Sequence, residues 1–312
     1  MMKNLRVLFM GTPDFAVASC KAIDDHCNLV GVVTQPDRPK GRGGKMAAPP
    51  VKIYAEERNL PVYQPLILKD GAFQDVLDEL QPELIVVAAY GRILPEYILE
   101  YPRYGCINVH GSLLPKYRGA APIQRAVMNG DPETGVTIMK MAKGMDTGDM
   151  ILQRAMPIYE WDTSGTIFEK MADIGADVLM EAIDKIITGT ATYTPQEDAL
   201  ATYAPMLEKA EGLLDFTQPA ATVRGIIMGM SPSPGAFIEI DGQRLKIYEA
   251  LFAGKTNCLP GTVTTISKEG IGIACGDRKA ILLKSIQKPG KSRTDAYSYA
   301  CGAKLNVGEY LK

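Results

Sequence analysis

The 312-residue sequence has few of the residues that build metal sites and disulfide frameworks. It contains two histidines, and its six cysteines include no Cys-x-x-Cys pair. This spacing indicates neither a zinc site nor a disulfide framework. We therefore expect no bound metal, and we expect the thiols to be small buried apolar residues. The cysteines are Cys20, Cys27, Cys106, Cys258, Cys275 and Cys301.

Long apolar runs and nucleotide-binding motifs are also absent. No run approaches the roughly 20 residues of a membrane span. The opening MMKNLRVLFMG enters a strand pattern too early for a signal or transit peptide. Neither GxGxxG nor GxxxxGK(S/T) occurs, which excludes the usual dinucleotide and P-loop phosphate sites. The sequence thus predicts a cytoplasmic protein that has no membrane segment.

The net charge of −2 hides an uneven distribution. Residues 1–208 carry 20 Lys and Arg against 27 Asp and Glu, whereas residues 209–312 carry 14 against 9. Within the acidic part, residues 35–52 hold five Lys and Arg against one Asp. Two basic regions on an otherwise acidic chain favour a polyanionic partner, and a merely solvated face is the alternative.

Strand-length apolar runs alternate with helical segments over residues 1–189. Strands are predicted at 5–10, 29–34, 84–89, 106–110 and 135–141. Helices are predicted from the GTPDF turn at 11–15 to about residue 25, and at 51–58, 73–79, 95–100, 122–129 and 164–188. This order predicts a Rossmann-like α/β domain with a mostly parallel sheet. The Gly- and Pro-rich segment 35–50 is predicted to be a long functional loop.

A polar, proline-containing linker is predicted at 190–208, and the pattern changes after it. Short alternating segments separated by Asp-Gly, Glu-Gly and Gly-Asp turns fill residues 209–312. They predict a small C-terminal β-barrel, similar to an OB fold. Small β-barrels commonly bind nucleic acid, and this one carries the basic excess.

The stretch CINVHGSLLPKYRG, residues 106–119, is the candidate for chemistry. Asn108 and His110 lie two apart on a strand, so both side chains leave the same face. An amide donor beside an imidazole suits an acyl centre, because Asn108 can bind a developing oxyanion while His110 either donates to it or moves a proton. The alternative is that the pair only caps the strand or satisfies a turn. His26, at a predicted helix end, is interpreted as structural.

Asp146 lies in the Gly-rich turn GMDTGD. It either bonds its own backbone, as aspartates in such turns usually do, or approaches His110 as a triad carboxylate would.

Together, NVHGSLLPKYRGAAPIQ, the downstream GMDTGD, the opening FMGTPDFA and the basic TQPDRPKGRGGK resemble the folate-dependent formyltransferase family. The resemblance covers essentially the whole chain. It implies formyl transfer from 10-formyltetrahydrofolate to the α-amine of initiator methionyl-tRNA, by a cytoplasmic monomer without a metal. Asn108, His110 and Asp146 match the catalytic trio of the family.

The resemblance also implies two binding regions. The formyltetrahydrofolate site matches residues 112–115, and the pterin is expected in an apolar slot lined by residues 87–94, Leu113, Leu114 and the Met141–Asp146 turn. The expected folate contacts are Ser112, Leu113, Leu114, Pro115, Val87, Tyr90, Gly91, Ile93 and Leu94. The loop expected at the tRNA acceptor end carries Arg38, Lys40, Arg42 and Lys45. The family pattern is not kept at Met206, Phe216 and Ser233.

Three other functions compete with this one. They are a sugar-nucleotide formyltransferase, a formyltetrahydrofolate hydrolase and a non-catalytic tRNA-binding module. The intact trio argues against the last. The basic loop argues against the first two, since a small amine or water needs no polyelectrolyte contact.

Overall fold

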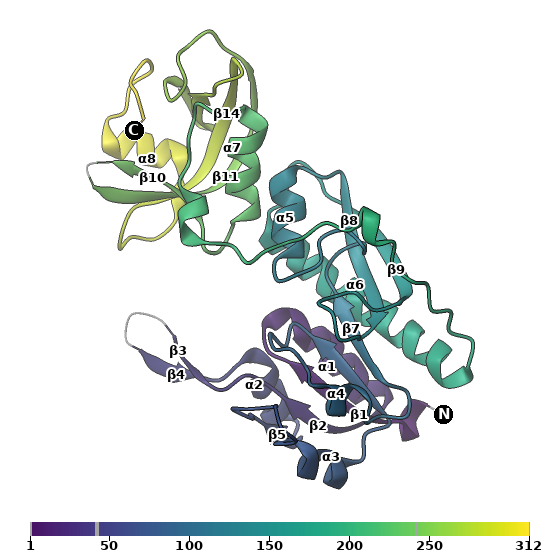
Figure 1. The fold of residues 1–312 in the computed structure, drawn as a ribbon. Helices are drawn as coiled ribbons and strands as arrows, with labels where there is room; N and C mark the ends of the chain where they lie inside the picture. The colour runs from purple at the N-terminus through teal and green to yellow at the C-terminus, as the bar shows by residue number, and fades with distance from the viewer. Residues whose placement is uncertain (1, 41–43, 241, 312) are drawn as a thin grey trace. The chain divides into compact units, whose positions relative to one another are not determined.

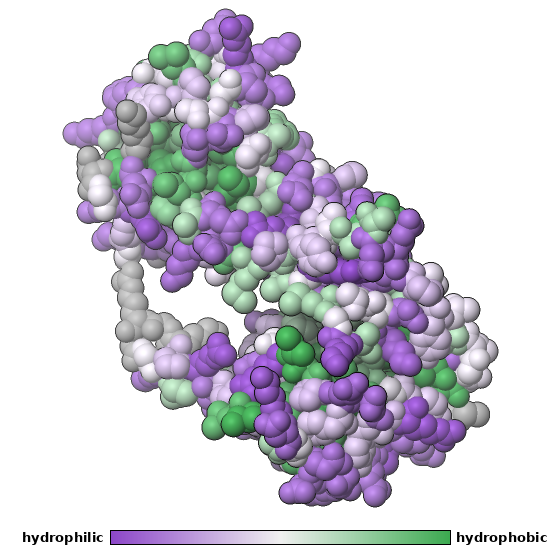
Figure 2. Space-filling model, in the orientation of Figure 1, coloured by the Kyte–Doolittle hydropathy of each residue, from purple (hydrophilic) through white to green (hydrophobic). Residues whose placement is uncertain are grey.

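A computed structural model describes residues 2–40, 44–240 and 242–311. The chain forms two compact units (Figure 1). The first unit comprises residues 1–120, 135–156 and 168–204, and the second comprises residues 121–134, 157–167 and 205–312. On the visible face of each unit, hydrophilic side chains predominate and smaller apolar patches lie between them (Figure 2).

The first unit is built on a seven-stranded sheet with the order β5-β2-β1-β6-β7-β8-β9. The pairings from β5 to β7 are parallel, and β8 runs antiparallel to β7. The sequence therefore predicted a mostly parallel sheet correctly. Its strands are β1 (Arg6–Gly11), β2 (Asn28–Val33), β5 (Val62–Tyr63), β6 (Leu84–Ala88), β7 (Cys106–His110), β8 (Glu133–Lys140) and β9 (Met150–Pro157).

Helices cover both faces of this sheet. On one face, Phe15 of α1 (Asp14–His26) meets Phe168 of α6 (Ser164–Thr188) edge to face at 6.0 Å. On the other face, α3 (Gln74–Leu80) and α4 (Glu96–Leu99) pack on a buried apolar cluster that includes Leu8, Ile85 and Cys106. This burial on both faces explains why β1 and β6 read as continuous apolar runs. Helix α2 (Pro50–Glu57) packs beside α1.

The second unit pairs helices with an antiparallel sheet. The strand order is β10-β11-β14-β13-β12, with β15 beside β14. The strands are β10 (Ala236–Ile240), β11 (Gln243–Lys255), β12 (Val263–Ser267), β13 (Gly270–Ala274), β14 (Lys279–Gln287) and β15 (Thr294–Asp295). The predicted C-terminal antiparallel strand domain is therefore present.

Helix α7 (Ala220–Gly229) packs closely on α5 (Pro122–Asn129) in this unit. A Cβ atom at Gly225 would lie 2.1 Å from the Met128 carbonyl oxygen, so only glycine permits this approach. At the positions that depart from the family pattern, Met206 and Ser233 are exposed and Phe216 is buried.

Several elements were not predicted. The loop expected at residues 35–50 contains a hairpin of β3 (Arg38–Lys40) and β4 (Lys45–Ala47). The predictions missed β9, α7 and α8 (Ala296–Ala303). His26 does end α1, where a ring nitrogen lies 2.9 Å from the Ala22 carbonyl oxygen. Among the helices of the described ranges, none is long and apolar enough to cross a membrane.

The prediction of buried cysteines is wrong for two of the six. Cys20, Cys106 and Cys275 are buried and Cys27 is partly buried, but Cys258 and Cys301 are exposed. Both exposed cysteines lie in the C-terminal unit. Cys258 is in a loop and Cys301 is in helix α8, and the alternating sequence pattern predicted the position of neither. Burial raises the pKa of the Cys20 and Cys106 thiols to about 12.

Thiol labelling of the native protein checks this assignment. At pH 8, iodoacetamide should modify Cys258 and Cys301 within minutes and leave Cys20, Cys106 and Cys275 unmodified, because the buried thiols are both inaccessible and protonated. Peptide mass spectrometry measures the modified fraction, and unfolding in guanidinium gives the control in which all six react. Labelling of Cys106 at the rate of Cys258 in the native protein would contradict the fold.

Candidate active site

Strand β7 places Asn108 and His110 in the middle of the sheet. Asn108 pairs with Val87 of β6 and Met139 of β8, and His110 pairs with Thr137. By strand alternation both side chains leave the same face as Cys106, the face covered by α3 and α4. Asn108 is half-buried, and its side chain makes no hydrogen bond to any residue that the structure describes. Its amide is therefore free to meet a substrate.

The imidazole of His110 is buried and has a defined tautomer. Its Nε2 lies 3.0 Å from the Tyr117 carbonyl oxygen. Because a carbonyl oxygen can only accept, Nε2 carries the proton and donates it. Nδ1 is then the nitrogen that can exchange a proton with a substrate.

Asp146 approaches this second nitrogen. Its Oδ2 lies 3.7 Å from His110 Nδ1 and accepts a hydrogen bond from the Gly119 N–H at 2.9 Å. The residue has a φ of 52°, in the left-handed region that aspartate tolerates better than most residues. Of the two interpretations of Asp146, the structure therefore shows the approach to His110. The tautomer, however, is fixed by the Tyr117 carbonyl, a contact that was not predicted.

A cavity of about 790 Å³ lies beside α4 in the first unit. Five of its lining residues belong to the slot predicted from the sequence: Ile93, Leu94, Met141, Ala142 and Lys143. The other lining residues were not predicted, because tertiary packing brings them together. They are Pro95, Glu96, Leu99, Glu100, Pro102, Arg103, Tyr104, Gly105, Lys140, Ile186 and Tyr193.

The other predicted folate contacts lie outside this lining. Val87, Tyr90 and Leu114 are buried, and Gly91 is exposed. Ser112 is fully buried, and its hydroxyl donates to the Lys116 carbonyl oxygen at 2.6 Å. Leu113 and Pro115 are half-buried.

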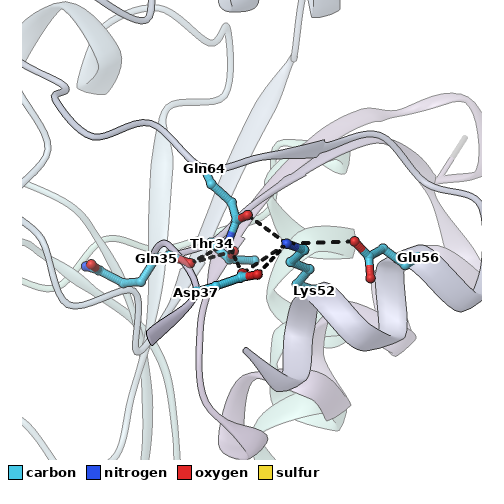
Figure 3. A network of polar contacts seen from close by, with 6 residues as sticks. All are labelled: Thr34, Gln35, Asp37, Lys52, Glu56 and Gln64. Atoms are coloured by element: carbon cyan, nitrogen blue, oxygen red, sulfur yellow. Dashed lines mark hydrogen bonds and ion pairs between the residues drawn. The ribbon is translucent and has the colours of Figure 1, made fainter. Parts of the chain in front are cut away.

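The basic segment forms the β3–β4 hairpin, and its base is held by a polar network (Figure 3). Lys52 of α2 lies 2.9 Å from the Asp37 carboxylate, and Gln64 donates to the same carboxylate at 2.9 Å. The hydrogen bond from Gln64 lowers the pKa of Asp37 the most, and the hydrogen bond from Lys52 lowers it further. Asp37 and Lys52 thus neutralise each other. The remaining positive charges of the segment are those carried by the hairpin.

Of the four predicted tRNA contacts, Arg38 and Lys45 have side chains that the structure describes, and both side chains are exposed. Lys40 pairs with Lys45 across the hairpin. Arg42 lies outside the described residues.

Cations of the second unit lie on aromatic rings. The Arg293 guanidinium is 3.6 Å from the centre of the Tyr248 ring, and that of Arg244 is 4.3 Å from the Phe237 ring. Both arginines are exposed. Across the described part of the chain, His, Cys, Asp and Glu side chains form no group of three that could hold a metal ion.

Two solved structures with the same fold were determined with a folate bound. The chain matches an N-formyltransferase from Helicobacter canadensis in complex with folinic acid and dTDP-3-aminofucose, with a TM-score of 0.68 at 19% identity, over 91% of this chain and 99% of that one. It also matches HypX from Aquifex aeolicus in complex with tetrahydrofolic acid, with a TM-score of 0.64 at 18% identity, over 99% of this chain and 49% of the other. At these identities the likeness shows the fold alone.

Sequence relatives are much closer. The methionyl-tRNA formyltransferase of Desulfotalea psychrophila is 47% identical over 99% of this chain and 96% of its own length. That of Geobacter sulfurreducens is 42% identical over 99% of this chain and 98% of its own. The formyl transferase model matches residues 3–183, and the formyl transferase C-terminal domain model matches residues 206–304. The chain therefore belongs to the formyltransferase family, in its methionyl-tRNA formyltransferase branch.

Proposed function

We propose that this protein transfers the formyl group of 10-formyltetrahydrofolate to the α-amine of initiator methionyl-tRNA, which gives formylmethionyl-tRNA for translation initiation. The observation that carries the proposal is that Asn108 and His110 share one face of β7 and that Asp146 lies 3.7 Å from His110, in a chain whose full-length relatives carry this activity in their names. Those relatives lend no support to the sugar-nucleotide or hydrolase alternatives.

The proposed reaction is a direct attack by the amine. An α-amine beside an ester is partly unprotonated near neutral pH, so no nucleophilic residue is needed. The amine nitrogen bonds to the formyl carbon, the carbonyl oxygen becomes an oxyanion, and the bond from carbon to N10 of the folate then breaks. The Asn108 amide donates to the oxyanion. His110 Nδ1 takes the proton that the amine loses, Asp146 lies beside the charge that results, and N10 receives the proton as it leaves.

The cavity beside α4 suits the folate. Its volume is typical of sites for drug-sized ligands, and its lining combines apolar side chains with a few polar ones. Ile93, Leu94, Leu99 and Met141 would hold the flat pteridine, and the side chains of Arg103, Lys140 and Lys143 would meet the glutamate carboxylates. Asn108 and His110 leave the sheet on the same face as Cys106, and Cys106 packs in one cluster with Leu94.

The tRNA is proposed to meet two basic regions. One is the hairpin with Arg38, Lys40, Arg42 and Lys45, whose fixed base would hold these charges against the acceptor end. The other is the C-terminal strand domain, where Arg244 and Arg293 are exposed over aromatic rings.

We assign residues 1–189 to catalysis, 190–208 to a linker and 209–312 to tRNA binding. A single chain supplies the trio and the cavity, which supports action as a monomer. The cytoplasmic location is proposed from the sequence relatives, which act on a tRNA by name.

The trio is tested by substitution. Asn108→Ala should lower kcat on methionyl-tRNA roughly 10²-fold, since one lost oxyanion donor is worth about 3 kcal/mol in the transition state. His110→Ala should lower kcat by roughly 10²-fold or more, since a positioned general base contributes about 10²- to 10⁴-fold. Asp146→Asn should also be severely slowed, because the amide cannot balance a protonated His110. Single-turnover kinetics measure the rates, and unchanged tRNA affinity is the control. A near-wild-type rate in any of the three would rule out its assigned role.

The folate assignment is tested by filling the cavity. Leu99→Trp should weaken 10-formyltetrahydrofolate binding at least about tenfold, because the indole occupies the space of the pteridine. The same substitution at Ile67, which is exposed and does not line the cavity, is the matched control. Calorimetry measures the Kd. Equal affinity of both variants would place the folate elsewhere.

The hairpin is tested by its ionic signature. If its cations meet phosphates, each of Arg38→Ala, Arg42→Ala and Lys45→Ala should lower the slope of log K against log salt concentration by about one. Arg42→Ala should also lower kcat/KM for methionyl-tRNA about 5- to 100-fold while barely affecting formylation of methionine methyl ester. Lys21→Ala, an exposed lysine on α1, is the control. Equal losses on tRNA and ester would show that the hairpin supports the active site instead.

A further inference from the structure

The loop that carries Asp146 is held by a side chain from a distant segment. Residues 141–149 between β8 and β9 form neither helix nor strand. The carbonyl oxygens of Asp146 and Gly148 both accept hydrogen bonds from Nε2 of Gln196, at 2.8 and 2.7 Å. Gln196 lies in the segment predicted to be a linker, and here that segment contacts the catalytic loop.

Arg118 fixes the orientation of the Gln196 amide. The Arg118 side chain is buried, and its Nε donates to Gln196 Oε1 at 2.9 Å. A guanidinium only donates and a carbonyl oxygen only accepts, so the amide must place its oxygen toward Arg118 and its nitrogen toward the loop. A second nitrogen of Arg118 donates to Asp198 at 2.8 Å.

The main chain joins the same two segments. The Arg118 N–H donates to the Thr202 carbonyl oxygen at 2.8 Å, and the Ala204 N–H donates to the Arg118 carbonyl oxygen at 2.7 Å. Gly119, the next residue, holds the Asp146 carboxylate through its N–H. A Cβ atom at Gly119, whose φ is 121°, would lie 2.8 Å from the Ala204 carbonyl oxygen, so this contact requires glycine.

We propose that Gln196, oriented by Arg118, is a positioning residue for formyl transfer: it holds the main chain of Asp146 so that the carboxylate stays next to His110. The inference rests on the proposed function, because it assigns Asp146 a role in that reaction. Oδ2 of Asp146 lies 3.7 Å from Nδ1 of His110 without a direct hydrogen bond, so the Gly119 N–H and the backbone of the loop together set their separation. Gln196 supplies the only side-chain donor to the Asp146 carbonyl within the described ranges.

A double-mutant cycle on kcat tests this. Gln196→Leu removes both hydrogen bonds and should lower kcat on methionyl-tRNA about tenfold, with KM for both substrates changed less than about twofold. In an Asp146→Asn background it should lower kcat less than about twofold, because the group through which it acts is already lost. Gln196→Asn keeps the amide but is too short to reach the loop, so it should lower kcat in the wild-type background and not in the Asp146→Asn background. It replaces Gln196→Leu in the cycle if the leucine variant folds poorly. Glu197→Gln, at the neighbouring exposed residue, is the matched control.

Two outcomes would overturn the proposal. One is an equal loss of kcat in both backgrounds, and the other is a loss confined to KM or to thermal stability. Hydrogen exchange gives a readout that does not need activity: peptides covering residues 144–149 should exchange faster in Gln196→Leu, while those of β1 and β6 should not. If the wild type fails to formylate methionyl-tRNA, the proposed function fails, and the exchange result still decides whether Gln196 holds the loop.

Discussion

Three consecutive residues, Tyr117, Arg118 and Gly119, hold the groups on which the proposed chemistry depends. The Tyr117 carbonyl fixes the tautomer of His110, and the Gly119 N–H holds the Asp146 carboxylate. Arg118 orients Gln196, which in turn holds the Asp146 main chain. A displacement of this short segment would move the base and its carboxylate together. The sheet supplies the rigid support, because β7 lies between β6 and β8 and is buried along most of its length.

Much of the fold could be predicted because periodicity and burial agree. The apolar runs of β1 and β6 are buried on both faces, and α5 and α6 have the bounds that the sequence predicted. Helix α7 was missed because its packing depends on close contact with α5 at Gly225, and glycines lower the helical signal. The β3–β4 hairpin was missed because its base is held by Lys52 and Gln64, which lie outside the segment.

The candidate site was predicted where its residues share one strand. Asn108 and His110 are two apart, so alternation placed them on one face. The role of Asp146 stayed open because a loop conformation decides it, and nothing local sets that conformation. Gln196 was beyond prediction for the same reason, since its partners are main-chain carbonyls far away in the sequence. The cavity shares Ile93, Leu94 and residues 141–143 with the predicted slot. Tyr104, Ile186 and Tyr193 were not predicted, because they reach the cavity through tertiary packing alone.

The central claim is the identity of the acceptor, and isotope tracing tests it most directly. The protein is incubated with 10-formyltetrahydrofolate labelled with ¹³C in the formyl group, in the presence of methionyl-tRNA and an amino-sugar nucleotide together. Mass spectrometry then locates the label. The account predicts that the label is on the α-amine of methionine and that its appearance there requires the protein. Label recovered as free formate or on the amino sugar, with none on methionine, would contradict it.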